Sequence, residues 1–298
     1  MPTKMLDSQA GRGGVQKTYK FGGGKNEIRA EDDGGSTFGY IINSGGGDDM
    51  IFGSDFSGRW TFDSTADPRT EFGDLLVGGD GSDNIEGGLG NDTIFGGNED
   101  GSDSAKGKDA VVRNILYGEA DILDTAGTYD AGNDVLVGGA DGSNLMVGDV
   151  GIAGGGGIFN GGNDILISGM NADDKMTGDF GSARGATIYG GEDTFVFGVN
   201  NGADLITDFR RTDDDGVGET PELIGDKINL TATGLSWDDL AGHININVIG
   251  GYTIIDLGQA IDDTAMAGVD QILVSGVIDL VEADFVFDML IDPGDALV

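Results

Sequence analysis

The chain has 298 residues, of which 58 are glycine, 4 are proline and none is cysteine. Its 53 acidic residues against 16 lysines and arginines give a net charge of −37, which makes the compact state self-repelling until counter-ions bind. Divalent cations are therefore the expected partner, and nucleic-acid binding is disfavoured. The sequence has no cysteine for disulfides, no apolar run long enough to cross a membrane and no signal-peptide pattern after Met1.

The first region, residues 1–43, is predicted to be a basic arm followed by one or two strands. Residues 1–30 hold six basic residues against two acids, a net charge of +4, so the remainder carries −41. A solvated tail is the plainer interpretation of about the first 15 residues. An arm that docks onto an acidic neighbour is the alternative. Residues 18–21 and 38–42 are the strand candidates.

Repetition begins at residue 44, and residues 44–106 are predicted to form a β-roll of nonapeptides with an inserted loop at 54–70. Residues 78–95 read GGDGSDNIE and GGLGNDTIF, two tandem units of the form G-G-x-G-x-D-x-U-x, where U is a large apolar residue. The glycines permit backbone angles that a Cβ would forbid, and the aspartate supplies carboxylate oxygens for a hard cation. Ile85 and Ile94 are expected to point into the coil from short strands.

At these residues the sequence resembles the repeats-in-toxin (RTX) family of calcium-binding β-roll proteins. The resemblance implies that turns on successive coils hold several Ca²⁺ ions between them, with the aspartate of each unit as the recurring ligand. The implied metal-site residues in this region are Asp49, Asp74, Gly78, Gly79, Gly81, Asp83, Gly87, Gly88, Gly90, Asp92 and, in a degenerate unit, Asp103.

A longer, 30-residue period takes over in residues 107–200, which are predicted to form further solenoid coils. Gly-Asn-Asp recurs at 132–134 and 162–164, and Tyr129, Phe159 and Tyr189 follow one another with the same period. Equivalent positions on successive coils stack at about 4.8 Å, so these aromatics are expected to form a ladder on one face. The apolar spacings leave open whether each coil has three short sides or two sides and a bulging loop. The expected inward residues are Leu116, Leu136, Met146, Ile158, Leu166, Met176, Ile188 and Phe195.

The same period extends the predicted ligand set. The charged positions are Asp134, Asp164, Asp174, Asp193 and Asp204. Asn114 and Asn144 occupy ligand places without charge, so the metal sites there are expected to be weaker or empty. Glu119, Asp149 and Asp179, which also recur with this period, are expected to compensate.

From residue 201 the sequence predicts a β-rich C-terminal cap that covers the open end of the coils. Residues 202–209 and 225–230 resemble the segment that follows the repeats in secreted RTX proteins such as the serralysin proteases. Ser236, with an acid three residues later, predicts the start of a short helix, and residues 244–248 and 252–255 flank a Gly-Gly pair as a hairpin. Residues 292–298 resemble the uncleaved signal recognised by a type I (ABC-transporter) exporter, and a frayed tail is the alternative.

The sequence lacks the common catalytic motifs, which favours a protein without enzyme activity. The single histidine, His243, cannot supply H-E-x-x-H, and the sequence has no G-x-S-x-G and no cysteine nucleophile. Residues 211–222 match an EF-hand loop in part, but Arg211 stands in the first ligand place and disfavours a separate calcium site there.

These features predict a secreted, calcium-dependent β-solenoid that is unfolded in the cytosol and folds where Ca²⁺ is abundant. The leading functional hypothesis is an extracellular structural subunit of a matrix, surface layer or filament, because head-to-tail contacts that do not close generate polymers. The alternative is a glycan- or host-surface-binding module whose binding face is Tyr129, Phe159 and Tyr189. An enzyme with an unrecognised site is the third hypothesis.

Overall fold

A computed structural model describes residues 3–5, 18–29, 40–53, 73–88, 90–103, 112–210, 225–247, 250–262, 270–276 and 280–287. Within these ranges the chain is mostly strands with few helices, and the strands pair chiefly in parallel. This agrees with the expectation of an all-β, parallel architecture. The predicted loop at 54–70, the EF-hand-like stretch at 211–222 and the C-terminal residues 292–298 lie outside the described residues, as does most of the basic arm.

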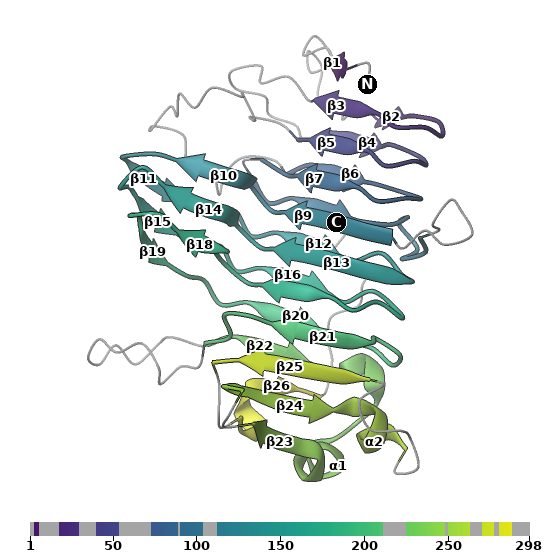
Figure 1. The fold of residues 1–298 in the computed structure, drawn as a ribbon, viewed down its shortest axis with the longest axis vertical. Helices are drawn as coiled ribbons and strands as arrows, with labels where there is room; N and C mark the ends of the chain where they lie inside the picture. Colours follow the sequence, from purple (N-terminus) through teal and green to yellow (C-terminus); the bar gives the residue numbers. More distant parts are fainter. Residues whose placement is uncertain are drawn as a thin grey trace.

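Two long sheets form the faces of a stack of coils (Figure 1). Sheet A runs in the order β1 (Thr3–Met5), β3 (Glu27–Arg29), β5 (Met50–Phe52), β7 (Asn84–Glu86), β9 (Val112–Tyr117), β13 (Gly142–Val147), β17 (Lys175–Thr177), β21 (Ala203–Ile206), β25 (Gln271–Ser275), β24 (Tyr252–Asp256) and β23 (Ile244–Asn247). Sheet B runs in the order β2 (Thr18–Lys20), β4 (Ile41–Asn43), β6 (Leu75–Val77), β8 (Thr93–Phe95), β12 (Val135–Val137), β16 (Ile165–Ile167), β20 (Thr194–Val196), β22 (Lys227–Asn229) and β26 (Phe285–Val286). From β2 to β9 the chain alternates between the two sheets, so each coil adds one strand to each sheet.

The core of the stack consists of one inward side chain from each short strand. In sheet A, Ile51, Ile85 and Leu116 lie in register and are fully buried. In sheet B, Leu136, Leu166 and Phe195 do the same. Burying a side chain of this size contributes about 1.5–3 kcal/mol, so two facing apolar rows can hold together strands of only three residues. The inward positions predicted for Ile85, Ile94, Leu116, Leu136, Met146, Leu166, Met176 and Phe195 are confirmed.

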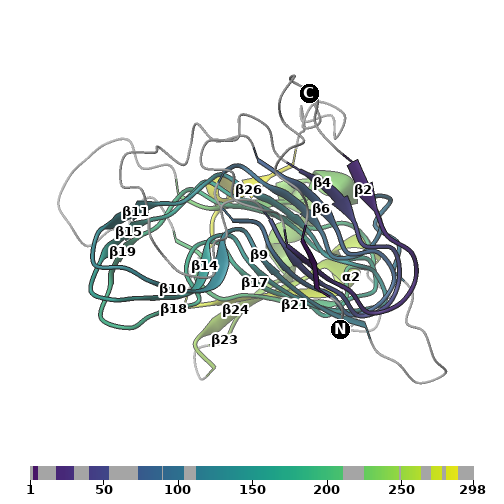
Figure 2. The same cartoon turned by 90° about the horizontal axis from the view of Figure 1, so that it is seen from above.

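The 30-residue coils add a lobe that projects from one flank, built from two small parallel sheets (Figure 2). One contains β10 (Ala120–Asp124), β14 (Val150–Gly154) and β18 (Ser182–Ala183), and the other contains β11 (Thr128–Asp130), β15 (Ile158–Asn160) and β19 (Thr187–Tyr189). Of the two open alternatives, the structure therefore has two sides and a bulge. The bulge has a core of its own, formed by Leu123, Tyr129, Ala131, Val150, Ala153, Phe159 and Phe180.

The lobe core corrects the predicted aromatic face. Tyr129 and Phe159 are in register, 5.8 Å apart between ring centroids, but they are only 4% and 0% exposed, so they cannot form a binding surface. Tyr189 is 58% exposed and pairs with Asn160. The prediction of a three-residue ladder is therefore wrong, and Phe180 is the ring that packs on Phe159, at 5.9 Å.

A turn that is shorter by a single residue explains the displacement of Tyr189. Ala153 pairs with Ala183, as the repeat period requires, whereas Ile158 pairs with Thr187 instead of Ile188. A slip of one residue moves a side chain to the opposite face of a strand. The inward predictions for Ile158 and Ile188 also fail, since these side chains are 43% and 41% exposed. Ile158 precedes the inward Phe159 and so points outward, and Ile188 lies on β19, the last strand of its sheet.

The C-terminal cap closes one end of the stack. Its hairpin pairs β23 with β24 in antiparallel fashion, as predicted, and β24 continues antiparallel to β25. The predicted helix is also present as α1 (Trp237–Leu240), which begins with a capping box between Ser236 and Asp239. A second helix, α2 (Leu257–Ile261), and the 3₁₀ turns η3 (Thr231–Thr233), η4 (Ala241–His243) and η5 (Glu282–Asp284) complete the cap. No helix in the described part of the chain is long and apolar enough to span a membrane.

Candidate cation sites in the turns

The turns between the two sheets stack in two columns. Column I leads from sheet B to sheet A, and column II leads from sheet A to sheet B, by way of the lobe in the 30-residue coils. Most coils place an aspartate or asparagine at the same point, just before the following strand or near its start, and Tyr40 takes this place before β4. In column I these residues are Asn26, Asp49, Asp83, Asn114, Asn144, Asp174 and Asp204. In column II they are Asp74, Asp92, Asp134, Asp164, Asp193 and Asp226.

One side-chain oxygen of these residues builds a ladder along each column. In column II the oxygen Oδ1 accepts the backbone N–H of the equivalent residue one coil earlier, from Asp92 on Asp74 to Asp226 on Asp193, with N···O distances of 2.6, 2.6, 2.7, 2.9 and 3.0 Å. Column I repeats the arrangement, for example between Asp49 N and Asp83 Oδ1 at 2.7 Å. The ladder uses one oxygen, Oδ1, of each of these carboxylates, so that Oδ2 remains for a second contact in the turn.

That second oxygen has no hydrogen-bond partner at several coils. It is buried and unpartnered at Asp83, Asp134, Asp164 and Asp193, whose side chains are at most 2% exposed. Burying a carboxylate oxygen without a partner is costly, so native structures normally satisfy such atoms with a donor or a cation.

A backbone carbonyl lies close to the second oxygen of Asp83, Asp134 and Asp164. A Cβ at Gly118 would collide with both Asp134 Oδ2 and the carbonyl oxygen of Gly148. One coil later, a Cβ at Gly148 would collide with Asp164 Oδ2 and the carbonyl oxygen of Gly178. Carboxylate and carbonyl oxygens that converge beside a glycine form the donor set that a hard cation such as Ca²⁺ prefers, so the residues present fit this ion.

Burial raises the pKa of these carboxyls. It raises the pKa of Asp83 to about 8 and that of Asp134 to about 8, because a charged carboxylate is poorly solvated there. For Asp164, burial is again the largest cause, and the neighbouring charges of Asp149 and Asp193 raise the pKa further. Near neutral pH the compact chain therefore favours protonation of these groups, or an added positive charge beside them.

The glycines of the nonapeptide serve two different purposes. Gly79 and Gly81 have φ angles of +90° and +129°, and Gly88 and Gly90 have +108° and +119°, values that favour glycine. Gly78 and Gly87, in contrast, are not among the residues with positive φ. At these first positions the limiting factor is space, because a Cβ would collide with the aspartate and with the next coil. The expectation that all three glycines serve the backbone angle is thus corrected for the first one.

In the 30-residue coils, column I satisfies its polar atoms with neutral donors. The Asn144 amide nitrogen donates to Gly139 O at 2.9 Å and to Asp174 Oδ1 at 2.7 Å. The Asn114 amide donates to Asp103 Oδ2 at 3.0 Å and to Asn144 Oδ1 at 3.0 Å. The two amides thus supply hydrogen bonds where an aspartate would present a second oxygen.

The predicted ligands Asp174 and Asp204 have protein donors for their second oxygens, unlike Asp134, Asp164 and Asp193 in column II. Asp174 Oδ2 accepts the N–H of Gly169 at 2.8 Å, and Asp204 Oδ2 accepts the Ser168 hydroxyl at 3.2 Å and the Asn201 amide. Among the described residues, no group of three or more His, Cys, Asp or Glu side chains has the spacing of a preformed metal site. The candidate sites instead combine carboxylates with backbone carbonyls.

Glu119, Asp149 and Asp179 lie where the chain leaves sheet A for the lobe. One oxygen of each accepts an N–H from the segment that returns from the lobe: Gly132 at 2.6 Å, Gly162 at 3.0 Å and Gly191 at 2.5 Å. These carboxylates belong to column II, and the charge of Asp134 helps to raise the pKa of Glu119. The expectation that they compensate for Asn114 and Asn144 is therefore wrong, because those asparagines lie in column I.

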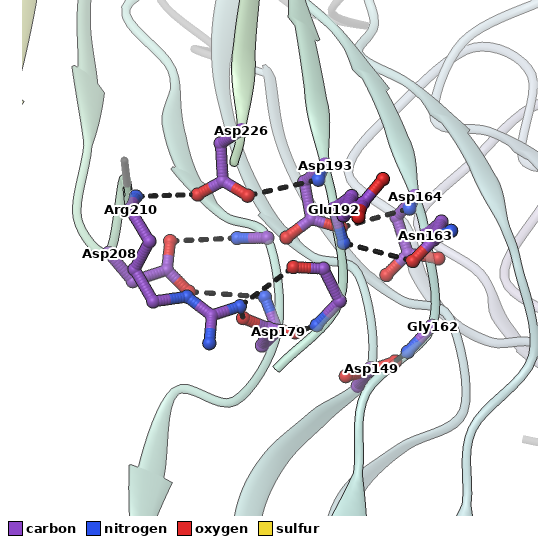
Figure 3. Close-up of polar contacts among 12 residues, drawn as sticks. Asp149, Gly162, Asn163, Asp164, Asp179, Glu192, Asp193, Asp208, Arg210 and Asp226 are labelled. Carbon is purple, nitrogen blue, oxygen red and sulfur yellow. Dashed lines mark hydrogen bonds and ion pairs between the residues drawn. The ribbon is translucent and has the colours of Figure 1, made fainter. Parts of the chain in front are cut away.

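Two features of the turns were not predicted. The asparagines of the Gly-Asn-Asp triplets form an outer ladder, in which Asn133 N donates to Asn91 Oδ1 at 2.9 Å and Asn163 N donates to Asn133 Oδ1 at 2.7 Å. Their recurrence in the sequence is the signal that could have indicated this ladder. The second feature is Arg210, whose guanidinium bonds Asp179 Oδ2 at 2.6 Å (Figure 3). It follows the last repeat and has no periodic signal.

Comparison of the chain with protein family models and with curated proteins finds no match. The interpretation of the turns as candidate cation sites therefore rests on the oxygen atoms that would coordinate the ion. Those atoms are buried carboxylate oxygens, one or two per coil in column II, facing the carbonyls of neighbouring coils.

Proposed function

We propose that this chain is a secreted, calcium-binding β-solenoid of the RTX type that folds on Ca²⁺ outside the cell and serves there as a structural subunit. The observation that carries the proposal is the buried oxygen without a partner, repeated from coil to coil at Asp134, Asp164 and Asp193. The tandem nonapeptides of residues 78–95 provide the RTX resemblance.

The residues that would hold the ions are those whose second oxygen turns toward a carbonyl. In column II they are Asp74, Asp92, Asp134 and Asp164, and in column I the residue is Asp83; Asp193 and Asp49 occupy the equivalent ladder places. Bound Ca²⁺ would supply the positive charge that lets these carboxylates be buried together. Without it, mutual repulsion within a chain of net charge −37 favours expanded states, which suit passage through a type I exporter.

A structural role agrees with the difference between the two ends of the stack. On the N-terminal side the sheets end at β1 and β2, whereas the cap covers the other end with β23, α1 and α2 (Figure 1). Unlike ends favour head-to-tail contacts, which polymerise when they do not close. The glycan-binding alternative loses its main support, because two of its three aromatic residues are buried in the lobe.

Light scattering and electron microscopy on the full chain test the proposal, with Ca²⁺ raised from excess chelator to about 10 mM, above the affinities of extracellular modules. We expect an expanded monomer to become compact and then to form regular polymers. Compact monomers at every concentration would overturn the structural role. No change in compaction would overturn calcium-dependent folding itself.

A further inference from the structure

The neck of the lobe, where the chain leaves column II and returns to it, carries two carboxylates per coil. The pairs are Glu119 with Asp134, Asp149 with Asp164 and Asp179 with Asp193. In each pair the first residue accepts an N–H across the neck, and the second belongs to the column II ladder. The nonapeptide turns have one aspartate at the corresponding place, so the neck doubles the negative charge per coil.

The remaining oxygens of these pairs lie in the interior. Glu119 Oε2, Asp134 Oδ2, Asp149 Oδ2, Asp164 Oδ2 and Asp193 Oδ2 are buried without a hydrogen-bond partner. The five side chains are between 0% and 2% exposed. Five acceptor atoms therefore face a region in which nothing donates to them.

The sixth residue, Asp179, shows what satisfies such an oxygen. The Arg210 guanidinium reaches over the last coil, and its Nη2 donates to Asp179 Oδ2 at 2.6 Å and to the carbonyl oxygen of Gly191 at 2.9 Å (Figure 3). The arginine is itself held by its backbone N–H, which bonds Asp226 Oδ2 at 2.7 Å. A positive charge thus already sits between a carboxylate and a carbonyl at the end of the neck.

The same place one coil earlier lies beside two carboxylate oxygens and the N–H of Gly191, which one of those oxygens already accepts. A Cβ at Gly190 would collide with Arg210 Nη2 and Asp179 Oδ2. Gly161 is its equivalent, since Asn160 pairs with Tyr189, and a Cβ there would meet Asp149 Oδ2 and Asp179 Oδ1. The guanidinium therefore occupies a position that the preceding coil places beside the carboxylates of Asp149 and Asp179.

We propose that the lobe neck is a file of cation sites with two carboxylates each, and that Arg210 is a built-in cation that ends the file. The inference rests on the proposed calcium binding and adds a second class of site to it. Because affinity rises with ligand charge, the neck sites bind more tightly than the single-aspartate turns. The earlier coils of the lobe therefore fold with bound cations, whereas in the last coil Arg210 takes the place of the cation.

Terbium luminescence tests the file, because Tb³⁺ takes the same oxygen ligands and emits when excited through a nearby tyrosine. Tyr129 is buried in the lobe, and the charges of Glu119 and Asp149 act on it. The difference in emission between the wild type and Tyr129→Phe isolates the neck from the other tyrosines. We expect Glu119→Gln to remove most of this difference and Asp49→Asn, in column I, to leave it unchanged.

Ion counting by equilibrium dialysis with Ca²⁺ tests the role of Arg210. We expect Arg210→Gln to bind one more ion per chain than the wild type and Arg210→Lys, which keeps the charge, to bind the same number. Two results would overturn this inference alone, provided that the chain still becomes compact with Ca²⁺. One is a Tyr129-dependent emission that Glu119→Gln leaves intact, and the other is an equal number of bound ions in the two arginine variants. The absence of any Ca²⁺ binding would overturn the proposed function as well.

Discussion

At the scale of single residues, aspartate and asparagine play the same part in the ladder and differ in one atom. Asp134 Oδ1 accepts the N–H of Asp92 at 2.6 Å, and Asn114 Oδ1 accepts the N–H of Asp83 at 2.9 Å. The second atom is an acceptor oxygen in the first case and a donor nitrogen in the second. Under the proposed calcium binding, a turn whose second atom is an oxygen with no donor is the one that takes up a cation.

Asp134→Asn is expected to make the metal-free fold more stable, because the ladder is kept while a buried charge is removed. Asp134→Ala is the matched control, since it also removes the ladder oxygen that accepts the N–H of Asp92. Removing one partner of a buried hydrogen bond costs about 1–3 kcal/mol, so the alanine variant should be less stable than the asparagine variant by that amount. Urea unfolding in excess chelator measures both, and equal stabilities would contradict the role assigned to the ladder.

The reverse change tests the same idea in column I. Asn144→Asp replaces the amide that bonds Gly139 O and Asp174 with a second buried oxygen. We expect lower stability in chelator and one more Ca²⁺ bound per chain. Unchanged calcium stoichiometry would show that the column I turns lack the carbonyls that a cation needs.

The positions of the ladder residues except Asn26 and Asp226 could be predicted from the sequence, but the partners of their second oxygens could not. The nonapeptide pattern marks Asp83 and Asp92 because turn, ligand and strand follow one another within a single short unit. The amide of Asn144 is satisfied by a carbonyl of its own turn and by a carboxylate on the next coil, which no local pattern encodes. Arg210 lies beyond the repeats, so only the folded chain brings it to Asp179.

At the scale of elements, the repeat period left a bulging loop as one of two alternatives and did not reveal how the lobe is built. Stacking with the 30-residue period correctly paired β9 with β13 and β13 with β17. The period alone could not locate the turn in which Arg184, Gly185 and Ala186 stand opposite the longer segment 154–157. That single missing residue changes which face of β19 carries Tyr189, and with it the expected binding surface.

Phe159→Ala and Tyr189→Ala should therefore have very different effects. Phe159 is fully buried between Tyr129 and Phe180, so its truncation should destabilise the folded chain by about 3–5 kcal/mol. Tyr189 is 58% exposed, and its truncation should change stability by no more than about 0.5 kcal/mol. Urea unfolding with saturating Ca²⁺ measures both variants, and a large loss for Tyr189→Ala would reinstate an inward ladder.

At the scale of the whole molecule, the stack concentrates negative charge in its interior. Along column II, Glu119, Asp149, Asp164 and Asp193 are buried, and burial together with the neighbouring carboxylates raises the pKa of each. Protons and bound cations can both neutralise these buried carboxylates. Calcium and acid should thus act on the fold in the same direction, which is the opposite of ordinary acid denaturation.

The metal-free chain is accordingly expected to be folded in acid and to unfold as the pH rises. Burial raises the pKa of Asp83 and Asp134 from 3.8 to about 8, so the folded state binds protons more tightly than the unfolded state. The stability is present below about pH 4 and is lost as the pH rises through about 8. Circular dichroism and light scattering in chelator measure this pH dependence, and Asp83→Asn combined with Asp134→Asn should weaken it.

Saturating Ca²⁺ should abolish the loss of stability at high pH, because the cation replaces the proton. A metal-free chain that expands on acidification would show that these carboxylates are ionised and satisfied without metal.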